Sequence, residues 1–139
     1  MSRLKNLFKK DENKLIVFIT AGFPKKESTE DLVLQAIEGG ADMIEIGIPF
    51  SDPQADGPII QKASEIALSN GISLSIIFDQ VRSIRKKTDI PIALMGYYNP
   101  ILAYGIDNFL NDCKTSQIDG IILPDLVMLH CWSCAYCLL

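Results

Sequence analysis

The sequence predicts an α/β fold built on a parallel sheet, either doubly wound or a (β/α) barrel. Two observations carry this prediction: short apolar runs recur along the chain, and segments with helical periodicity separate them. Such alternation requires right-handed crossovers between parallel strands. With 139 residues, of which 48% are apolar, the chain has the size and composition of one globular domain.

Four runs are the expected strands, because each is short, rich in β-branched residues and nearly unbroken by polar ones. They are residues 15–20 (LIVFIT), 43–48 (MIEIGI), 90–97 (IPIALMGY) and 120–125 (GIILPD). A full (β/α)8 barrel takes roughly 250 residues. About four parallel strands would therefore make a half-barrel.

Helical segments are expected before and between these strands. The first ten residues are basic and amphipathic, and predict a short surface helix. Residues 28–40 offer Ser28 or Thr29 as N-cap, acids in the first turn and a glycine stop. Further helices are expected at residues 59–71, 74–88 and 106–117.

Charge and composition exclude several classes of partner. The net charge of -4 comes from interspersed acids and bases without a basic stripe, so a nucleic-acid partner is not expected. Asp11 and Glu12 precede any apolar run that could serve in a secretory signal, which favours a cytoplasmic location. Residues 121–139 carry one charge, but Pro124 and Asp125 interrupt them, so no membrane span is expected.

The last thirteen residues, 127–139 (VMLHCWSCAYCLL), differ in character from the rest of the chain, because they are hydrophobic and rich in cysteine. Cysteines at positions 131, 134 and 137 follow His130, which raises the possibility of a zinc or iron–sulfur site. A structural zinc site usually pairs two separated ligand elements, and only one is present. We therefore expect no metal, and we divide the chain into residues 1–126 and a separate tail, 127–139.

Three expected strands end in loop sequences of unusual chemistry, TAGFP, PFSDPQADGP and GYYNP. In a (β/α) barrel, the loops at the carboxyl ends of the strands form the active site. No G-x-G-x-x-G sequence follows a strand, so a dinucleotide site is not supported.

Glu45 lies inside the second expected strand, between Ile44 and Ile46. Because side chains alternate along a strand, its carboxylate points to the face opposite those two isoleucines. Inside an apolar barrel, desolvation would raise its pKa toward the range that is useful for proton transfer. Glu45 is thus a candidate general acid or base, and the alternative is a structural hydrogen bond or ion pair.

Asp52 and Asp56 fall in the loop after this strand, where both can simply shape turns. If Asp56 converges with Glu45 on one pocket, the two carboxylates can take separate acid and base roles. Tyr97, at the end of the third expected strand, and Phe18, inside the first, can line a flat apolar ligand or plug the barrel.

Four segments resemble, in order and spacing, the alpha subunit of tryptophan synthase. They are FITAGFP, GADMIEIGIPFSDPQADGPIIQKAS, ALMGYYNPI and DGIILPDL, and the resemblance covers roughly residues 1–126. It implies the (β/α)8 (TIM) barrel family and a lyase of tryptophan biosynthesis. The implied reaction is the retro-aldol cleavage of indole-3-glycerol phosphate to indole and glyceraldehyde 3-phosphate.

The resemblance also implies roles for individual residues. Glu45 matches the glutamate that moves a proton to the indole ring carbon, and Asp56 the aspartate that holds the indole N–H. Phe18 and Tyr97 match aromatic positions around the indole. The segment Pro49, Phe50, Ser51, Asp52 and Pro53 resembles the loop that docks on the beta subunit.

The resemblance implies an alpha2-beta2 assembly in which the alpha subunit needs no cofactor or metal, and pyridoxal phosphate belongs to the beta subunit. The family's chain is about twice as long, and its second half brings the loops that hold the substrate phosphate. Two alternatives remain open. The chain can be an inactive fragment that retains only beta-subunit docking. It can also belong to another class of phosphate-handling barrel, which would not explain the block from Glu45 to Asp56.

Overall fold

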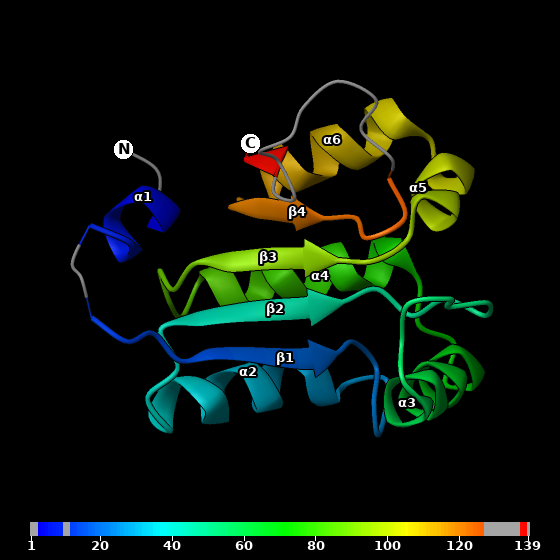
Figure 1. Ribbon diagram of the computed structural model, residues 1–139, viewed down its shortest axis with the longest axis horizontal. Helices are drawn as coiled ribbons and strands as arrows, with labels where there is room; N and C mark the ends of the chain where they lie inside the picture. The colour runs from blue at the N-terminus through cyan, green and yellow to red at the C-terminus, as the bar shows by residue number, and fades with distance from the viewer. Residues whose placement is uncertain (1–2, 10–11, 127–136, 139) are drawn as a thin grey trace.

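A single sheet forms the centre of the computed structural model, which describes residues 3–9, 12–126 and 137–138. Four strands run parallel in sequence order, and a short fifth strand pairs antiparallel with the fourth (Figure 1). The strands are β1 (Ile16–Thr20), β2 (Met43–Gly47), β3 (Ile92–Met95), β4 (Gly120–Ile122) and β5 (Cys137–Leu138). The four predicted strands and their parallel arrangement are confirmed. The described part of the chain is a half-barrel.

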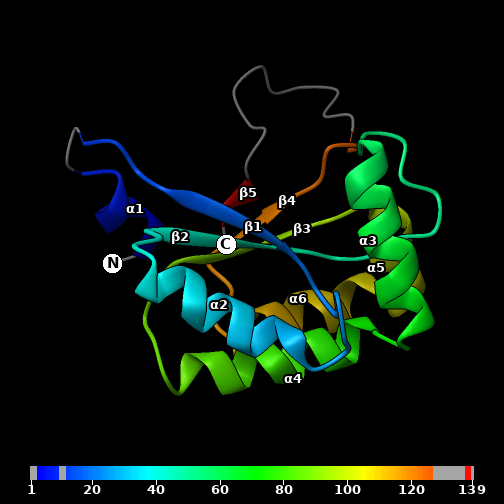
Figure 2. The same ribbon diagram turned by 90° about the horizontal axis from the view of Figure 1, so that it is seen from below.

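Helices occupy three positions around this sheet. They are α1 (Arg3–Leu7), α2 (Ser28–Glu38), α3 (Pro58–Ser69), α4 (Leu74–Arg85), α5 (Tyr98–Tyr104) and α6 (Ile106–Thr115). Figure 2 shows α2, α4 and α6 together on one side of the sheet. In Figure 1, α3 and α5 lie beyond the carboxyl ends of the strands, and α1 lies at the opposite end.

The core lies between the sheet and the layer of α2, α4 and α6. Ile44 and Ile46 of β2 are fully buried there, together with Leu94 of β3. Val33 of α2 and Phe78 of α4 pack into the same cluster. Alternate residues of each strand therefore serve this core, and the residues between them line the other face of the sheet. We call that other face, which carries Met43, Glu45, Ala93 and Ile122, the inner face.

The predicted short helix at the N-terminus is present as α1, and its Leu4 is buried against Met43 and Ala93 on the inner face. The predicted N-cap of α2 was wrong, because Glu27 takes that position. Thr29 does not cap α2. Its hydroxyl oxygen accepts a hydrogen bond from the Gly22 N–H at 3.0 Å, which holds the loop after β1 against the helix.

A short strand covers part of the edge of β4. The backbone of β5 pairs there with Gly120 and Ile121. The rest of the predicted tail, residues 127–136 and 139, lies outside the described residues. The proposed boundary at residue 126 stays a prediction.

A buried ion pair joins the carboxyl end of α4 to the amino-terminal ends of β3 and β4. Asp119, just before β4, lies 2.5 Å from the Arg85 guanidinium at the end of α4, and both side chains are buried. The same carboxylate accepts the Ile92 N–H at 2.9 Å and lies 3.3 Å from Arg3 of α1. Arg3 also reaches the exposed Asp89. This cluster stabilises the end of the sheet opposite to the predicted site.

Candidate active site

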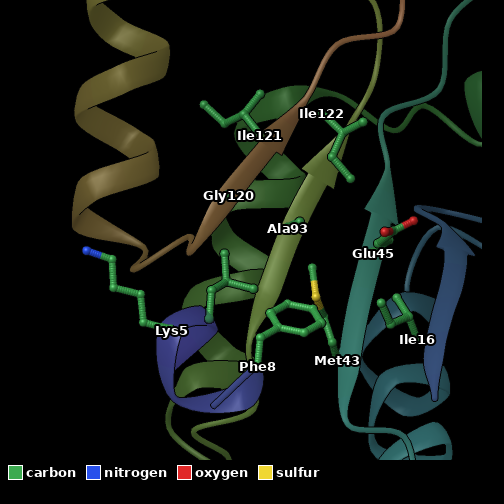
Figure 3. Close-up of a pocket in the computed structure, with 10 residues that line it drawn as sticks. Lys5, Phe8, Ile16, Met43, Glu45, Ala93, Gly120, Ile121 and Ile122 are labelled. Carbon is green, nitrogen blue, oxygen red and sulfur yellow. The ribbon is translucent and has the colours of Figure 1, made fainter. Parts of the chain in front are cut away.

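The strand register places two predicted site residues, Phe18 and Glu45, in one row across the sheet with Ala93. Glu45 of β2 is paired with Phe18 of β1 on one side and with Ala93 of β3 on the other. Because Ile44 and Ile46 belong to the core, Glu45 points to the inner face, as strand alternation predicts. Figure 3 shows its carboxylate above Met43 of the same strand and near Ile16 of β1.

A pocket of about 530 Å³ opens along this inner face. Its lining is almost wholly apolar and comes from α1, the residue that follows it and all four parallel strands. The lining residues are Leu4, Lys5, Phe8, Ile16, Met43, Glu45, Ala93, Gly120, Ile121 and Ile122. Among them Glu45 is the single carboxylate, so a ligand in this pocket would meet one acid in apolar surroundings.

Burial raises the pKa of Glu45 above its ordinary value near 4.5. Across residues 3–9 and 12–126, no hydrogen bond or ion pair reaches its carboxylate, and burial is the one cause of the shift. The alternative role in a structural ion pair therefore finds no partner in this part of the chain. A carboxyl group with a raised pKa in an apolar pocket is suited to donate and accept protons near neutral pH.

The other predicted residues meet at a second, smaller cavity at the carboxyl ends of the strands. This cavity has a volume of about 20 Å³, and Phe18, Asp56 and Tyr97 line it together with Thr20, Gly47, Ile48, Ile60, Ser64, Met95, Gly96 and Pro124. The structure thus brings three of the predicted residues together. Glu45 lines the larger pocket instead, and Phe18, its neighbour across the strands, lines the smaller one. Glu45 and Asp56 thus line different cavities in the described part of the chain, and their convergence on one pocket stays a prediction.

Tyr97 holds the loop that carries Asp56. Its hydroxyl oxygen accepts a hydrogen bond from the Ala55 N–H at 2.9 Å. Burial raises the pKa of Tyr97 above its ordinary value; the hydrogen bond from Ala55 opposes the rise, and the negative charge of Asp56 adds to it. The Phe50 ring packs on the Tyr97 ring at a centroid distance of 5.4 Å.

The segment predicted to dock on a partner follows β2 directly. Pro49 is buried and Phe50 is half-buried against Tyr97, so the start of the segment is fixed. Ser51 and Asp52 are exposed, and Pro53 is half-buried. This pattern leaves the middle of the segment accessible and its start attached to the barrel end.

Sequence reasoning missed the polar side chains that hold the neighbouring loops. Asn70, at the end of α3, donates to the carbonyl oxygens of Gly22 and Pro24 at 2.9 Å each. The Asp125 carboxylate accepts the Tyr98 N–H at the start of α5. The position of Asp125 after a strand end was a usable signal. Nothing local to Asn70 indicates a contact 48 residues away.

Cysteine and metal chemistry finds little support in the described part. Cys113 is buried and free, and burial, with Asp112 beside it, raises the pKa of its thiol to about 12, so it is not a reactive nucleophile. No group of three metal-ligating side chains occurs among the described residues. Cys131 and Cys134 lie outside them, so the expectation of no metal stays a prediction.

None of the described helices is long and apolar enough to cross a membrane.

Comparison with known proteins gives one consistent family. The family model described as tryptophan synthase alpha chain matches residues 4–134, past the boundary predicted at residue 126. The chain is 48% identical over 126 residues to the tryptophan synthase alpha chain of Christiangramia forsetii, which covers 91% of this chain and 49% of that protein.

Solved structures give the same result. A tryptophan synthase subunit alpha from Legionella pneumophila superposes with a TM-score of 0.87 at 43% identity, covering 91% of this chain and 50% of that one. A tryptophan synthase complex from Pyrococcus furiosus superposes at 0.76 with 47% identity, covering 82% and 47%. The chain spans about half the length of the curated relatives it matches. On the family match, the sequence identity and the shared fold, the chain belongs to the tryptophan synthase alpha chain family.

Proposed function

We propose that this chain provides the proton-transfer half of an indole-3-glycerol phosphate lyase in tryptophan biosynthesis. The reaction is a retro-aldol cleavage. A proton is added to the indole ring carbon, and the glycerol hydroxyl loses its proton. The bond between that ring carbon and the glycerol carbon that carries the hydroxyl breaks. The products are indole and glyceraldehyde 3-phosphate. Because the chain spans about half of its relatives, we propose this activity for the protein in which the barrel is complete.

The observation that carries the proposal is the environment of Glu45. Its carboxyl group lies in an apolar pocket of about 530 Å³, burial raises its pKa, and no described residue pairs with it. Such a group can deliver a proton to a ring carbon and accept one from a hydroxyl. An apolar pocket of this size is also suited to a flat aromatic ring.

Asp56 and the aromatic residues would act at the indole end of the substrate. We assign Asp56 to hold the indole N–H and to stabilise the indolenine-like intermediate. Phe18 shares a cavity with Asp56 and is paired with Glu45 in the strand register, which supports a role for its ring beside the indole. With Tyr97, it would pack against the indole.

We also propose that the segment from Pro49 to Pro53 docks on a tryptophan synthase beta subunit in an alpha2-beta2 assembly. The exposed Ser51 and Asp52 support this role, since they stand out from a segment whose start is buried. The alpha chain would use no cofactor of its own, and pyridoxal phosphate would belong to the beta subunit. The cytoplasmic location stays a prediction from the N-terminal sequence.

Indole release from indole-3-glycerol phosphate tests the proposal. The purified chain is assayed alone, with a beta subunit, and with a polypeptide that corresponds to the second half of the Christiangramia forsetii alpha chain. We expect Glu45→Gln to lower the rate about 10²- to 10⁴-fold in the active mixture, because general acid–base catalysis contributes that much. Glu38→Gln, the same change at an exposed carboxylate, should leave the rate unchanged.

Full activity in Glu45→Gln would contradict the proposed role of this residue. If no mixture releases indole but the chain binds the beta subunit, the alternative is supported: the chain then acts as a docking fragment. A beta-binding assay with Asp52→Ala tests docking separately from catalysis. The variant should bind the beta subunit more weakly, because docking depends on the exposed segment and proton transfer by Glu45 does not.

A further inference from the structure

The backbone of Tyr97 is fixed on both sides by β4 and the loop after it. Gly96, one residue before, donates its N–H to the Ile122 carbonyl at 3.1 Å. Tyr98, one residue after, donates its N–H to both carboxylate oxygens of Asp125, at 3.1 and 3.0 Å. The tyrosine ring is 6% exposed. Tyr97 is therefore a rigid point at the carboxyl end of the sheet.

The hydroxyl group of Tyr97 connects this rigid point to the loop that carries Asp56. A phenol has one proton to donate and two lone pairs to accept with. Because the oxygen accepts the Ala55 N–H at 2.9 Å, it fixes the backbone immediately before Asp56, and the Asp56 and Tyr97 side chains line the same small cavity. One oxygen atom thus attaches the part of the loop that carries Asp56.

The ring of Tyr97 holds the beginning of the same loop. Phe50, in the segment predicted to dock on a partner, packs on the ring at a centroid distance of 5.4 Å with the planes tilted by 36°. Aromatic pairs in such arrangements contribute beyond the area they bury. Ring and hydroxyl together contact both ends of the stretch from Phe50 to Asp56.

We infer that Tyr97 is a positioning residue, which fixes the backbone beside Asp56 and attaches the predicted docking loop to the end of the sheet. This role, exerted through Ala55 and Phe50, is additional to the contact of its ring with the indole that is proposed above. A shift of the docking loop on a partner would then change the orientation of Asp56 through one side chain. The inference rests on the proposed function only for the role of Asp56.

Hydrogen exchange of the loop tests the attachment. Tyr97→Phe keeps the ring and its contact with Phe50, but removes the acceptor of the Ala55 N–H. We expect amide exchange in residues 50–57 to become roughly fivefold faster, as the loss of one hydrogen bond predicts. Tyr104→Phe is the matched control. It removes a hydrogen bond from Tyr104 of α5 to Asp112 of α6, and neither residue belongs to the loop. Equal exchange of the loop in wild type and Tyr97→Phe would overturn the inference.

A spectroscopic test isolates the link between Tyr97 and Asp56, which simple packing would not reveal. The chain is labelled at the tyrosine ring Cζ carbons with ¹³C, and the Tyr97 resonance is assigned by its loss in Tyr97→Phe. Asp56→Asn should move this resonance and lower the pH at which the phenol ionises, because a carboxylate beside it opposes ionisation. Asp52→Asn, an exposed aspartate of the same loop, should leave it in place.

An unmoved Tyr97 resonance in Asp56→Asn would overturn the inference, whatever the activity of the chain. Both measurements use the free chain without substrate or beta subunit. If the free chain passes both tests but no mixture with the second half and a beta subunit releases indole, the proposed function is refuted and the positioning role is retained. Where indole release is measurable, Tyr97→Phe should lower kcat and leave KM unchanged, whereas a residue that only lines the substrate would raise KM.

Discussion

Phe18 lies where a side chain at position 47 would otherwise be. A Cβ atom built on Gly47 would come within 2.4 Å of the Phe18 Cζ atom, which is closer than any real contact. Gly47 is the last residue of β2, two positions after Glu45 on the same face. The missing side chain thus determines where the predicted indole-binding ring packs.

Replacing Gly47 by alanine should destabilise the fold and displace the Phe18 ring. Overpacking of this kind costs about 1–3 kcal/mol of unfolding free energy. Gly39→Ala is the control, since its Cβ would meet atoms at an ordinary 3.4 Å. Urea denaturation of both variants measures the difference, and equal stabilities would show that Phe18 moves aside without cost.

The raised pKa of Glu45 predicts a pH-dependent effect on stability. Below its ordinary pKa near 4.5, the residue is protonated in folded and unfolded states, and no charge is buried. As the pH rises through the higher pKa of the folded state, the half-buried carboxylate ionises and the wild-type chain loses stability. Glu45→Gln avoids this loss. Its stability advantage should grow from pH 4.5 toward neutral pH.

Chemical denaturation of wild type and Glu45→Gln at a series of pH values checks this prediction. A difference that stays constant with pH would show that burial does not perturb Glu45. The expected result, a variant that is more stable at neutral pH and inactive, is typical of a residue that is retained for function at the expense of stability.

At the scale of elements, periodicity predicted the strands and the longer helices, but not α5. The sequence around Tyr97, Tyr98, Asn99 and Pro100 resembles a turn, because aromatic residues and proline favour other structures than helix. Pro100 falls in the first turn of the helix, where its missing N–H is not needed. The cap of α5 comes from Asp125, 27 residues later, so no local pattern contains it.

Asp125→Ala should therefore weaken α5 specifically. Loss of a side-chain cap lowers the free energy of unfolding by about 1 kcal/mol, and amides of residues 98–104 should exchange faster. Asp125→Asn keeps an acceptor oxygen and should lose less. Amide hydrogen exchange of both variants measures the effect on α5. Unchanged exchange of α5 in Asp125→Ala would contradict the assignment of Asp125 as its cap.

At the scale of the whole molecule, four elements meet at Asp119. Its carboxylate contacts Arg3 of α1, Arg85 of α4 and the first residue of β3, and it immediately precedes β4. Removal of one member of a buried ion pair leaves the other charge without compensation, which costs about 3–5 kcal/mol. The cluster is therefore expected to affect the stability of the entire fold.

Asp119→Ala should lower the free energy of unfolding by several kcal/mol, because Arg85 would remain buried and unpaired. Asp89→Ala is the matched control, since Asp89 also pairs with Arg3 but its side chain is 90% exposed. An exposed pair contributes about 0–1 kcal/mol. Thermal or urea unfolding of both variants tests the ranking, and a loss no larger in Asp119→Ala than in Asp89→Ala would contradict it.

The candidate site was predictable to the extent that it depends on local pattern. Alternation along β2 was enough to place Glu45 on the inner face, and the loop after β2 was enough to place Asp56 near the carboxyl ends. The hydrogen bond from Ala55 to Tyr97 joins residues 42 positions apart, and the packing of the Phe18 ring against Gly47 joins two different strands. Such features follow from tertiary packing, to which a single sequence gives no direct access.

The contact between Arg3 and Asp119 spans 116 positions, nearly the length of the described chain. During synthesis on the ribosome, α1 leaves the exit tunnel before its ionic partner, which is made more than a hundred residues later. Contacts of such separation form late, because a long loop must close before they contribute. Helix α1, although made before the strands that it contacts, is thus among the last elements to dock, and until then Leu4 and the inner face are exposed to chaperones.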